Sequence, residues 1–369
     1  MIYFDNAATT FPKPPEVIDA VCTLMREYGG NPGRGGHRLS RLCGEKIFEC
    51  RENFARLIGA ENPERIIFTK NTTEALNLAI KGTLSPGDEI IISSMEHNSV
   101  LRSAVSMEKK GVTVKIARAS SKGVVTFDSI EPLITNKTKL ICVIHASNVV
   151  GTVNPVEDIC VKARQKGVLT LIDCAQTGGI LPIDASYFDM AAFAGHKGLY
   201  GPFGTGILYI REPLMPLPLI EGGTGSLSES ALMPEILPDR YEAGTLNASA
   251  ISGLNEGIKF VMREGVYEKE KELVKLLTEK LSSIKGVRIL GEPGVGVVGV
   301  VLSGLDCVDA AQRLDAEFSV AVRAGLHCAP MAHRTLGTIS HGMLRFSPGF
   351  FNTAEDIDFV CSAVEKILY

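Results

Sequence analysis

Lys197 and Asp173 are the residues whose type and surroundings point most directly to chemistry. Lys197 follows an apolar run at 190–193 and the dipeptide Gly195-His196, and glycines recur at 201–206. A lysine that must form a Schiff base needs a fixed backbone, a pocket that lowers its pKa, and glycines that let a phosphate-bearing ring approach. Asp173 ends the apolar run 168–172, where its carboxylate can pair with a protonated pyridine nitrogen. The order of the two residues along the chain, first Asp173 and then Lys197, predicts a site for pyridoxal 5'-phosphate (PLP).

Thr72 and Thr73 are the candidate phosphate ligands. They follow Asn71 at the start of a predicted helix, directly after a short apolar strand. A helix N-terminus presents backbone N–H groups and a favourable dipole to an anion, and threonine hydroxyls add donors. The alternative is an ordinary N-cap. The presence of Lys197 and Asp173 favours phosphate binding.

His97 and Asn148 occupy similar positions after two other predicted strands, 89–92 and 140–144. The loops that follow the strands of an open α/β sheet form its ligand crevice. We expect the His97 imidazole to stack on the pyridine ring and Asn148 to donate a hydrogen bond to the ring oxygen or to the substrate. A lone histidine is more often a satisfied polar residue, so the assignment of His97 depends on its position beside the other strand ends.

Cys328 is the candidate nucleophile. It follows His327 and lies close to Arg323, so it can be held partly as a thiolate. The opposing interpretation is a zinc site formed by His327, Cys328, His333 and His341. Only one thiol would contribute and the spacing is not that of a zinc finger, so we expect no metal.

Arg345 ends a predicted strand at 343–346. A guanidinium is the natural bidentate partner for the carboxylate of an amino acid, so Arg345 is a candidate clamp for the substrate. The alternative is a surface salt bridge.

The elements that must position these residues form two regions. Between 65 and 211, short apolar runs alternate with helical stretches, which predicts a mostly parallel sheet whose strands are buried on both faces. Beyond about 252, an amphipathic helix at 267–284, strands near 297–302, 319–322 and 343–346, and helices at 308–317 and from 353 predict a smaller α+β region. Residues 215–241 show no periodicity. We expect a large PLP-binding domain at 15–251, and a small domain from 1–14 and 252–369.

Composition narrows the class of protein. The 369 residues carry a net charge of −4, are 45% hydrophobic and show no basic cluster, so we expect no nucleic-acid partner. No apolar stretch approaches the ~20 residues that span a bilayer, so we expect a cytoplasmic protein without a membrane segment. The nine cysteines form no regular pattern and predict no disulfide scaffold.

The chain resembles the cysteine desulfurases of the class V aminotransferase family over nearly its whole length. The matching stretches are Asp5 to Thr10, Asn71 to Ala75, Glu96-His97, Ser147-Asn148, Asp173 to Gln176, Gly195 to Lys197, Glu242 to Thr245, Arg323 to Cys328 and Arg345 to Ser347. The resemblance implies a fold type I PLP enzyme that forms a homodimer with a shared active site. It implies these roles: Lys197 as Schiff-base lysine, Asp173 as pyridinium partner, Gln176 as donor to the ring hydroxyl, His97 as stacking imidazole, Thr73 and His196 as phosphate ligands, and Thr245 as a ligand to the phosphate of the neighbouring subunit.

The short segment around Cys328 is similar to the second group of these enzymes, in which the cysteine lies on a compact loop and a sulfur-acceptor protein docks over the site. Ala194 departs from the family, because a phosphate-binding serine is common there. The implied reaction converts L-cysteine to L-alanine and leaves a persulfide on Cys328. The alternatives are a selenocysteine lyase acting on L-selenocysteine, and a non-enzymatic Cys/His carrier of sulfur or metal.

Overall fold

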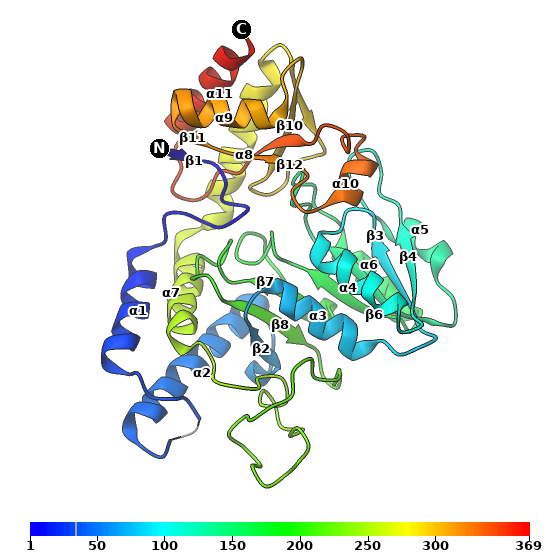
Figure 1. The fold of residues 1–369 in the computed structure, drawn as a ribbon, viewed down its shortest axis with the longest axis vertical. Coiled ribbons are helices and arrows are strands. Elements are labelled where there is room, and N and C mark those ends of the chain that lie inside the picture. Colours follow the sequence, from blue (N-terminus) through cyan, green and yellow to red (C-terminus); the bar gives the residue numbers. More distant parts are fainter. Residues whose placement is uncertain (34) are drawn as a thin grey trace.

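The computed structural model describes residues 1–33 and 35–369, and a large sheet lies at its centre (Figure 1). The neighbouring strands from β7 to β4 pair in parallel, whereas β8 is antiparallel to both β7 and β2. The strand order is β2 (Ile66–Thr69), β8 (Gly206–Ile210), β7 (Met190–Ala194), β6 (Leu169–Asp173), β5 (Thr138–Ile144), β3 (Glu89–Ser93) and β4 (Thr113–Ala117). The α/β fold with a mostly parallel sheet, predicted from the sequence, is confirmed.

Burial explains why these runs form strands. Every residue of β3, β7 and β8 is buried, as expected of strands covered on both faces. β4 differs from the prediction. Thr113 and Ile116 are exposed because β4 forms an edge of the sheet, where one side has no neighbouring strand.

Helices cover both faces of the large sheet. On one face, α3 (Thr72–Thr83) and α4 (Asn98–Glu108) bury apolar side chains against β3, β5 and β6. On the other face lie α2 (Arg38–Ile58), α6 (Val156–Gln165) and α7 (Ala248–Glu264), and α1 (Pro15–Glu27) packs against α7. The remaining short helices are η1 (Pro63–Arg65), α5 (Phe127–Ile130), η2 (Glu131–Leu133) and η3 (Ala185–Tyr187).

The C-terminal part is built around a smaller sheet, at the top of Figure 1. Its strands follow the order β12 (Arg323–Gly325), β13 (Met343–Phe346), β10 (Val298–Leu302) and β9 (Val287–Leu290). The N-terminal strand β1 (Ile2–Tyr3) joins this part by pairing in parallel with β11 (Val320–Ala321). The helices of this part are α8 (Val266–Ser283), α9 (Cys307–Phe318), α10 (Pro330–Thr335) and α11 (Ala354–Leu368), and α11 begins with a capping box at Thr353.

The division into two domains remains a prediction. The predicted boundary at 251/252 lies inside α7, which packs against α1 and α2. Gly265, with a φ of 60°, separates α7 from α8. We propose that the small domain begins at this glycine.

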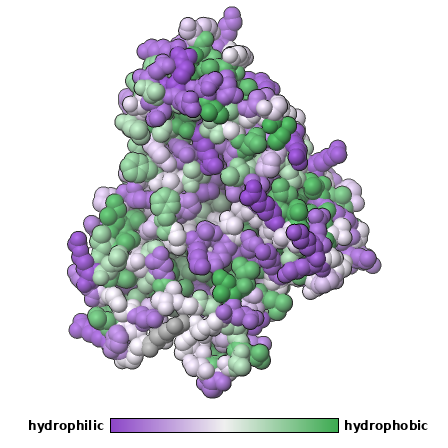
Figure 2. Space-filling model, in the orientation of Figure 1, coloured by the Kyte–Doolittle hydropathy of each residue, from purple (hydrophilic) through white to green (hydrophobic). Residues whose placement is uncertain are grey.

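Residues 215–241 contain no helix or strand, as predicted, and form the loops at the bottom of Figure 1. They expose several apolar side chains, among them Leu217, Leu232 and Ile236. In Figure 2 hydrophobic and hydrophilic surface alternate at this end of the molecule. No helix formed by residues 1–33 or 35–369 is long and apolar enough to cross a membrane.

Candidate active site

A cavity of about 220 Å³ lies where the parallel strands β3, β5, β6 and β7 end. Ligands of open α/β sheets bind at this edge, because the carboxyl ends of neighbouring parallel strands meet there. The structure brings together most of the predicted cofactor residues in its lining: Thr72, Thr73, His97, Asn148, Asp173, Gln176, His196 and Lys197.

Lys197 lies on a tight turn directly after β7. Its backbone oxygen accepts hydrogen bonds from the Tyr200 N–H at 2.7 Å and from Thr10 Oγ1 at 3.1 Å, so the backbone is fixed from two sides. At Gly195 a Cβ would overlap Thr205, which explains the glycine. Burial lowers the pKa of Lys197 to about 8, although Asp173 opposes this shift. A larger neutral fraction makes the amine a better nucleophile and base at neutral pH.

Asp173 is the last residue of β6, and its side chain is held in place by the Ala175 N–H, which donates to Oδ1 at 2.9 Å. Burial raises the pKa of this carboxyl, while the Lys197 ammonium acts in the opposite direction. A further cation near it would therefore favour the charged carboxylate. Gln176 follows on the same turn, and its Nε2 donates to the Ala7 oxygen at 3.1 Å.

His97 caps α4 with its imidazole. Nδ1 accepts a hydrogen bond from the Ser99 N–H at 3.1 Å, which assigns the proton of the neutral ring to Nε2. Burial, and then the charge of Lys197, lower the pKa of His97 to about 4. The ring is therefore neutral at physiological pH and can lie against an aromatic cofactor or donate from Nε2.

The phosphate side of the cavity is formed by the start of α3. Asn71 is the N-cap, because its Oδ1 accepts a hydrogen bond from the Glu74 N–H at 2.9 Å. Thr72 and Thr73 therefore occupy the first helical positions and are not the cap, so their hydroxyls are available to an anion. Thr73 Oγ1 also donates a hydrogen bond to Ser99 Oγ at 3.2 Å.

Unpartnered polar atoms test whether the site fits PLP and an amino acid. Among the described residues few buried side-chain atoms lack a hydrogen-bond partner, and His196 Nδ1 and Asn148 Oδ1 are two of them. Both residues line the cavity, and Arg345 Nε is a third such atom beside Asn148. A buried polar atom without a partner costs ~1–3 kcal/mol, so a bound group is expected to supply the partners. The residues present fit a phosphorylated pyridine ring carrying an amino acid.

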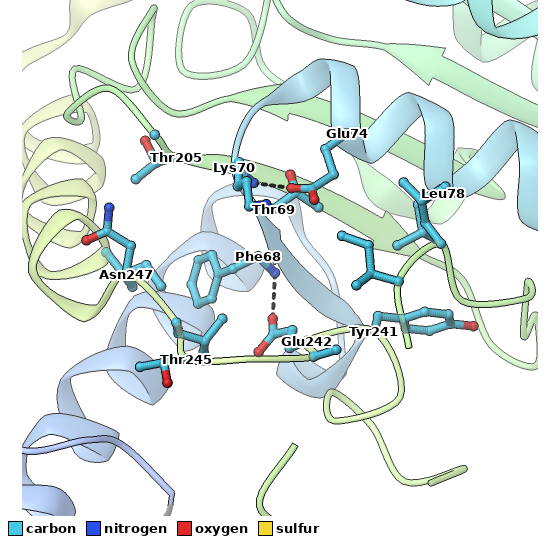
Figure 3. Close-up of a pocket in the computed structure, with 16 residues that line it drawn as sticks. Phe68, Thr69, Lys70, Glu74, Leu78, Thr205, Tyr241, Glu242, Thr245 and Asn247 are labelled. Atoms are coloured by element: carbon cyan, nitrogen blue, oxygen red, sulfur yellow. Dashed lines mark hydrogen bonds between the residues drawn. The ribbon is translucent and has the colours of Figure 1, made fainter. Parts of the chain in front are cut away.

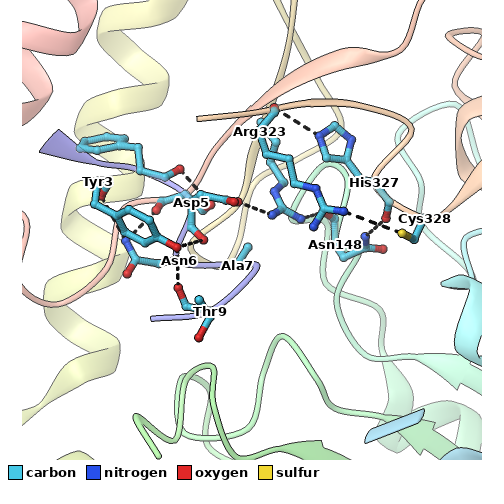
Figure 4. A network of polar contacts seen from close by, with 12 residues as sticks. Tyr3, Asp5, Asn6, Ala7, Thr9, Asn148, Arg323, His327 and Cys328 are labelled. Atoms are coloured by element: carbon cyan, nitrogen blue, oxygen red, sulfur yellow. Dashed lines mark hydrogen bonds and ion pairs between the residues drawn. The ribbon is translucent and has the colours of Figure 1, made fainter. Parts of the chain in front are cut away.

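Cys328 lies on the loop after β12, with an exposed side chain (Figure 4). The Asn98 N–H donates to the Cys328 oxygen at 2.7 Å, and Asn148 Nδ2 donates to the His327 oxygen at 2.7 Å. These contacts hold the loop against the rim of the Lys197 cavity. Arg323 Nη2 lies 3.8 Å from the sulfur, where its charge favours a thiolate.

The expected contribution of His327 to the thiolate is wrong. Its Nδ1 lies 3.5 Å from His333 Nε2 and its Nε2 lies 3.4 Å from the Arg323 oxygen, so the ring is directed away from the sulfur. Burial lowers the pKa of His327 to about 2, which makes it a neutral neighbour. Across residues 1–33 and 35–369, no three His, Cys, Asp or Glu side chains are grouped to hold a metal ion.

Arg345, at 1% exposure, does not line the cavity itself. Its Nη2 donates to Asp5 Oδ1 at 2.6 Å and its Nη1 donates to the Asn148 oxygen at 3.0 Å. In this structure Asp5 therefore occupies the place expected for a substrate carboxylate (Figure 4). Sequence reasoning did not identify Asp5 as its partner, although the matching stretch Asp5 to Thr10 begins with this residue.

Thr245 is the predicted cofactor ligand that does not line the Lys197 cavity. It is exposed and lines a separate pocket of about 220 Å³ with Thr205, Glu242 and Asn247 (Figure 3). Glu242 anchors this segment, because its carboxylate accepts a hydrogen bond from the Phe68 N–H at 2.6 Å. A role for Thr245 in cofactor binding would require a second subunit.

Comparison with known proteins agrees with this geometry. The family described as Aminotransferase class-V matches residues 2–360. A Methanothermobacter thermautotrophicus protein named "Probable cysteine desulfurase" is 36% identical over 99% of this chain and 94% of its own length. The apo structure of cysteine desulfurase from Thermococcus onnurineus NA1 has a TM-score of 0.91 at 35% identity, covering 100% of this chain and 94% of that one. The Escherichia coli cysteine desulfurase CsdA has a TM-score of 0.88 at 28% identity, covering 99% and 94%. The chain belongs to the class V aminotransferase family, whose enzymes depend on PLP.

Proposed function

We propose that this protein is a PLP-dependent cysteine desulfurase, which converts L-cysteine to L-alanine and leaves the sulfur as a persulfide on Cys328. One observation carries the proposal: the loop that carries an exposed thiol beside Arg323 is held at the rim of the Lys197 cavity, by hydrogen bonds from the Asn98 N–H and from Asn148 Nδ2. The names of the relatives support the same activity. No contact in residues 1–33 or 35–369 favours the selenocysteine lyase or the non-enzymatic carrier.

PLP would be held by residues that already line the cavity. Asp173 would face the ring nitrogen, Gln176 the ring hydroxyl and His97 the ring face, while Thr72, Thr73 and His196 would donate to the phosphate. When bound, PLP supplies an electron sink that stabilises negative charge at the substrate Cα. Ala194 is buried at the end of β7, so these phosphate contacts come from α3 and His196 without a serine at 194.

Lys197 and His97 would move the protons. The neutral Lys197 amine can accept a proton from the substrate Cα at Nζ, because its pKa is close to the working pH. Neutral His97 can donate from Nε2, where its proton lies, since Nδ1 accepts a hydrogen bond from the Ser99 N–H. Both residues line the same cavity.

Cys328 would take the sulfur. Its thiolate attacks the substrate sulfur, a sulfur–sulfur bond forms, and the substrate carbon–sulfur bond breaks with its electron pair passing to the carbon side. Protonation of that carbon, and return to Cα of the proton that Lys197 accepted, give alanine. Arg323 stabilises the attacking thiolate, because a nearby guanidinium favours the charged sulfur.

Three residues would bind the substrate: Asn148, Arg323 and Arg345. Asn148 Oδ1 and Arg345 Nε are buried without partners and could contact the amino acid. A substrate carboxylate would replace Asp5 on Arg345, which exchanges one carboxylate for another and leaves the net charge at the guanidinium unchanged.

The assembly would be a homodimer in which Thr245 reaches the phosphate site of the partner. The exposed Thr245 pocket and the exposed apolar residues of 215–241 support this arrangement. A sulfur-acceptor protein would receive the persulfide from Cys328, whose compact loop keeps the sulfur close to the protein surface. The cytoplasmic location remains a prediction.

Product analysis tests the proposal. Purified protein should contain PLP and release alanine from L-cysteine, and Lys197→Ala should abolish this release. Cys328→Ser should abolish it as well, whereas Cys22→Ser, a change at a half-buried thiol on α1, should leave it unchanged. Alanine release by Cys328→Ser at the rate of the wild type would refute the role of the thiol. A higher kcat/KM for L-selenocysteine together with negligible turnover of L-cysteine would favour the lyase instead.

A further inference from the structure

His327 and His333 are buried imidazoles that the proposed reaction does not use. Their exposed fractions are 3% and 0%, and neither residue lines the Lys197 cavity. The two rings are stacked, with centroids 5.7 Å apart and an angle of 16° between their planes. Burying a polar ring costs free energy unless its nitrogens find partners. The pair lies beside the loop that carries Cys328, so its purpose there is the question.

The partners of the two rings determine which nitrogens carry protons. The Arg323 oxygen can only accept, so His327 Nε2, which lies 3.4 Å from it, is the protonated nitrogen. His327 Nδ1 then accepts from His333 Nε2 at 3.5 Å, and His333 Nδ1 accepts from the Thr338 hydroxyl at 2.8 Å. Both rings are neutral in this arrangement. The charged groups that face His327 are the cations Arg323 and Arg345, which oppose a further positive charge.

His333 is itself fixed by backbone contacts. It lies on α10, where its N–H donates to the Ala329 oxygen at 3.2 Å. Its own oxygen accepts from the Thr338 N–H at 2.8 Å, and the Thr338 oxygen accepts from the Gly342 N–H at 2.8 Å. Thr338 and His333 are therefore joined through both backbone and side chain. This pair is a firm point of attachment for the His327 ring.

The residues attached there have an unfavourable backbone conformation. His327 and Cys328 have φ angles of 49° and 56°, and neither is glycine. Such a conformation persists only when its surroundings hold it. The hydrogen bonds from Asn148 and Asn98 hold the two carbonyl oxygens, and the His333 contact holds the His327 side chain. This left-handed turn places the Cys328 sulfur 3.8 Å from Arg323 Nη2 (Figure 4).

We propose that His333 is a positioning residue for Cys328, because it anchors the His327 side chain and so holds the left-handed turn that keeps the thiol beside Arg323. The inference rests on the proposed role of Cys328. Arg323 is fixed separately, since β12 pairs with β13. The anchor therefore acts on the position of the thiol. Without it, the turn would relax to negative φ and the sulfur would move away from the guanidinium.

Alkylation of Cys328 by iodoacetamide tests the proposal in the apoprotein, with mass spectrometry to identify the modified cysteine. The thiolate is the reacting form, so the rate at pH 7 reports the nearby charge. His333→Phe keeps a ring but removes the donor to His327, and should slow alkylation about two- to fivefold, as expected for a unit charge withdrawn from ~4 Å in water. His333→Gln keeps an N–H donor and should restore the rate. His341→Phe, at an exposed position, is the control.

A second change at Arg323 separates positioning from general loosening of the loop. Arg323→Met alone should slow alkylation by a similar factor. Adding His333→Phe to it should slow alkylation no further, because both changes remove the same contact between thiol and cation. Additive effects would overturn the proposal, as would a wild-type rate in His333→Phe.

Thr338→Val keeps the test available if His333→Phe does not fold. It is nearly isosteric and removes the hydroxyl that donates to His333 Nδ1. It should slow alkylation in the same direction, and the effect should vanish in the Arg323→Met protein. Thr278→Val, at a half-buried position on α8, should leave the rate unchanged. A wild-type rate in a folded Thr338→Val protein, or slowing that persists beside Arg323→Met, contradicts the assigned anchor.

The same measurement separates this inference from the proposed function, because it uses neither PLP nor L-cysteine. The expected alkylation pattern in a protein that releases no alanine would leave the anchor intact and refute the proposed reaction. Alanine release by a protein whose His333 variants alkylate like the wild type would refute the anchor alone.

Discussion

Replacing Arg345 by lysine keeps the positive charge and tests how much the bidentate geometry of the guanidinium contributes to substrate binding. The fork now makes two contacts, to Asp5 at 2.6 Å and to the Asn148 oxygen at 3.0 Å, with Nε available to a substrate carboxylate. Lysine keeps the charge, but its ammonium lacks the rigid, planar donors with which a guanidinium binds a carboxylate through two parallel hydrogen bonds. Losing one charge-assisted, desolvated contact costs about 2–4 kcal/mol, which corresponds to a decrease in kcat/KM of roughly 30- to 1,000-fold.

Steady-state kinetics on L-cysteine measure this loss, and absorbance of the bound cofactor measures PLP content. We expect KM to rise strongly while PLP content and the visible spectrum stay unchanged, since Arg345 does not line the PLP cavity. Arg334→Lys, at an exposed position on α10, is the control. Arg345→Ala is a harsher change, because it leaves Asp5 without its cation and should also lower Tm. Loss of PLP from Arg345→Lys, or an unchanged KM, would refute the carboxylate clamp.

Three further perturbations test other parts of the site. Rebinding of PLP to the apoprotein should accelerate about tenfold from pH 7 to pH 9, because a Lys197 pKa of about 8 means that the neutral amine increases over this range; stopped-flow absorbance would reveal a flat profile if the lysine were not the acceptor. Asp173→Asn should retain PLP and reduce kcat by ~100- to 1,000-fold, since the amide cannot stabilise the ring proton electrostatically; wild-type turnover would exclude that role. Mixed dimers of Thr245→Ala and Lys197→Ala should regain activity above either parent, because one of the two sites is then intact, whereas a simple average of the parents would argue against a shared site.

The fold was largely predictable from local patterns. Strands buried on both faces appear as short apolar runs, and the predicted runs 89–92, 140–144, 168–172 and 190–193 match β3, β5, β6 and β7 within two residues at each end. The predicted strand at 319–322 differs, because β11 pairs with β1 whereas the residues that follow form β12 beside β13. Helix α7 was not predicted, although its buried Ile251, Leu254 and Ile258 recur at helical spacing. Buried small and polar residues, such as Ser252, Gly253 and Asn255, lie between them and obscure the pattern.

The candidate site was predictable where a residue follows a strand. Asp173, Lys197, His97 and Asn148 could be assigned to one edge of the sheet because parallel strands place their carboxyl ends together. The contact of Asp5 with Arg345 spans 340 positions, and local spacing carries no signal for such a pair. Long-range packing decides these partners, so a structure is needed to identify them.

Sequence adjacency wrongly suggested that His327 directly stabilises the Cys328 thiolate. His327 precedes it, yet both residues have positive φ angles, 49° and 56°, and the chain turns so that the imidazole packs beside His333 while the thiol faces solvent. The cation beside the thiol is Arg323, five positions away. A neutral buried imidazole cannot stabilise a thiolate by charge, so the guanidinium provides this effect.

Asn148 joins the two halves of the proposed reaction. Its backbone oxygen accepts a hydrogen bond from Arg345, and its side-chain amide donates to the His327 oxygen beside Cys328. The carboxylate clamp and the thiol loop therefore share one residue, which itself lines the Lys197 cavity. Residues that share a partner in this way do not contribute independently to free energy, so the clamp, the loop and the cavity are best understood as a single unit.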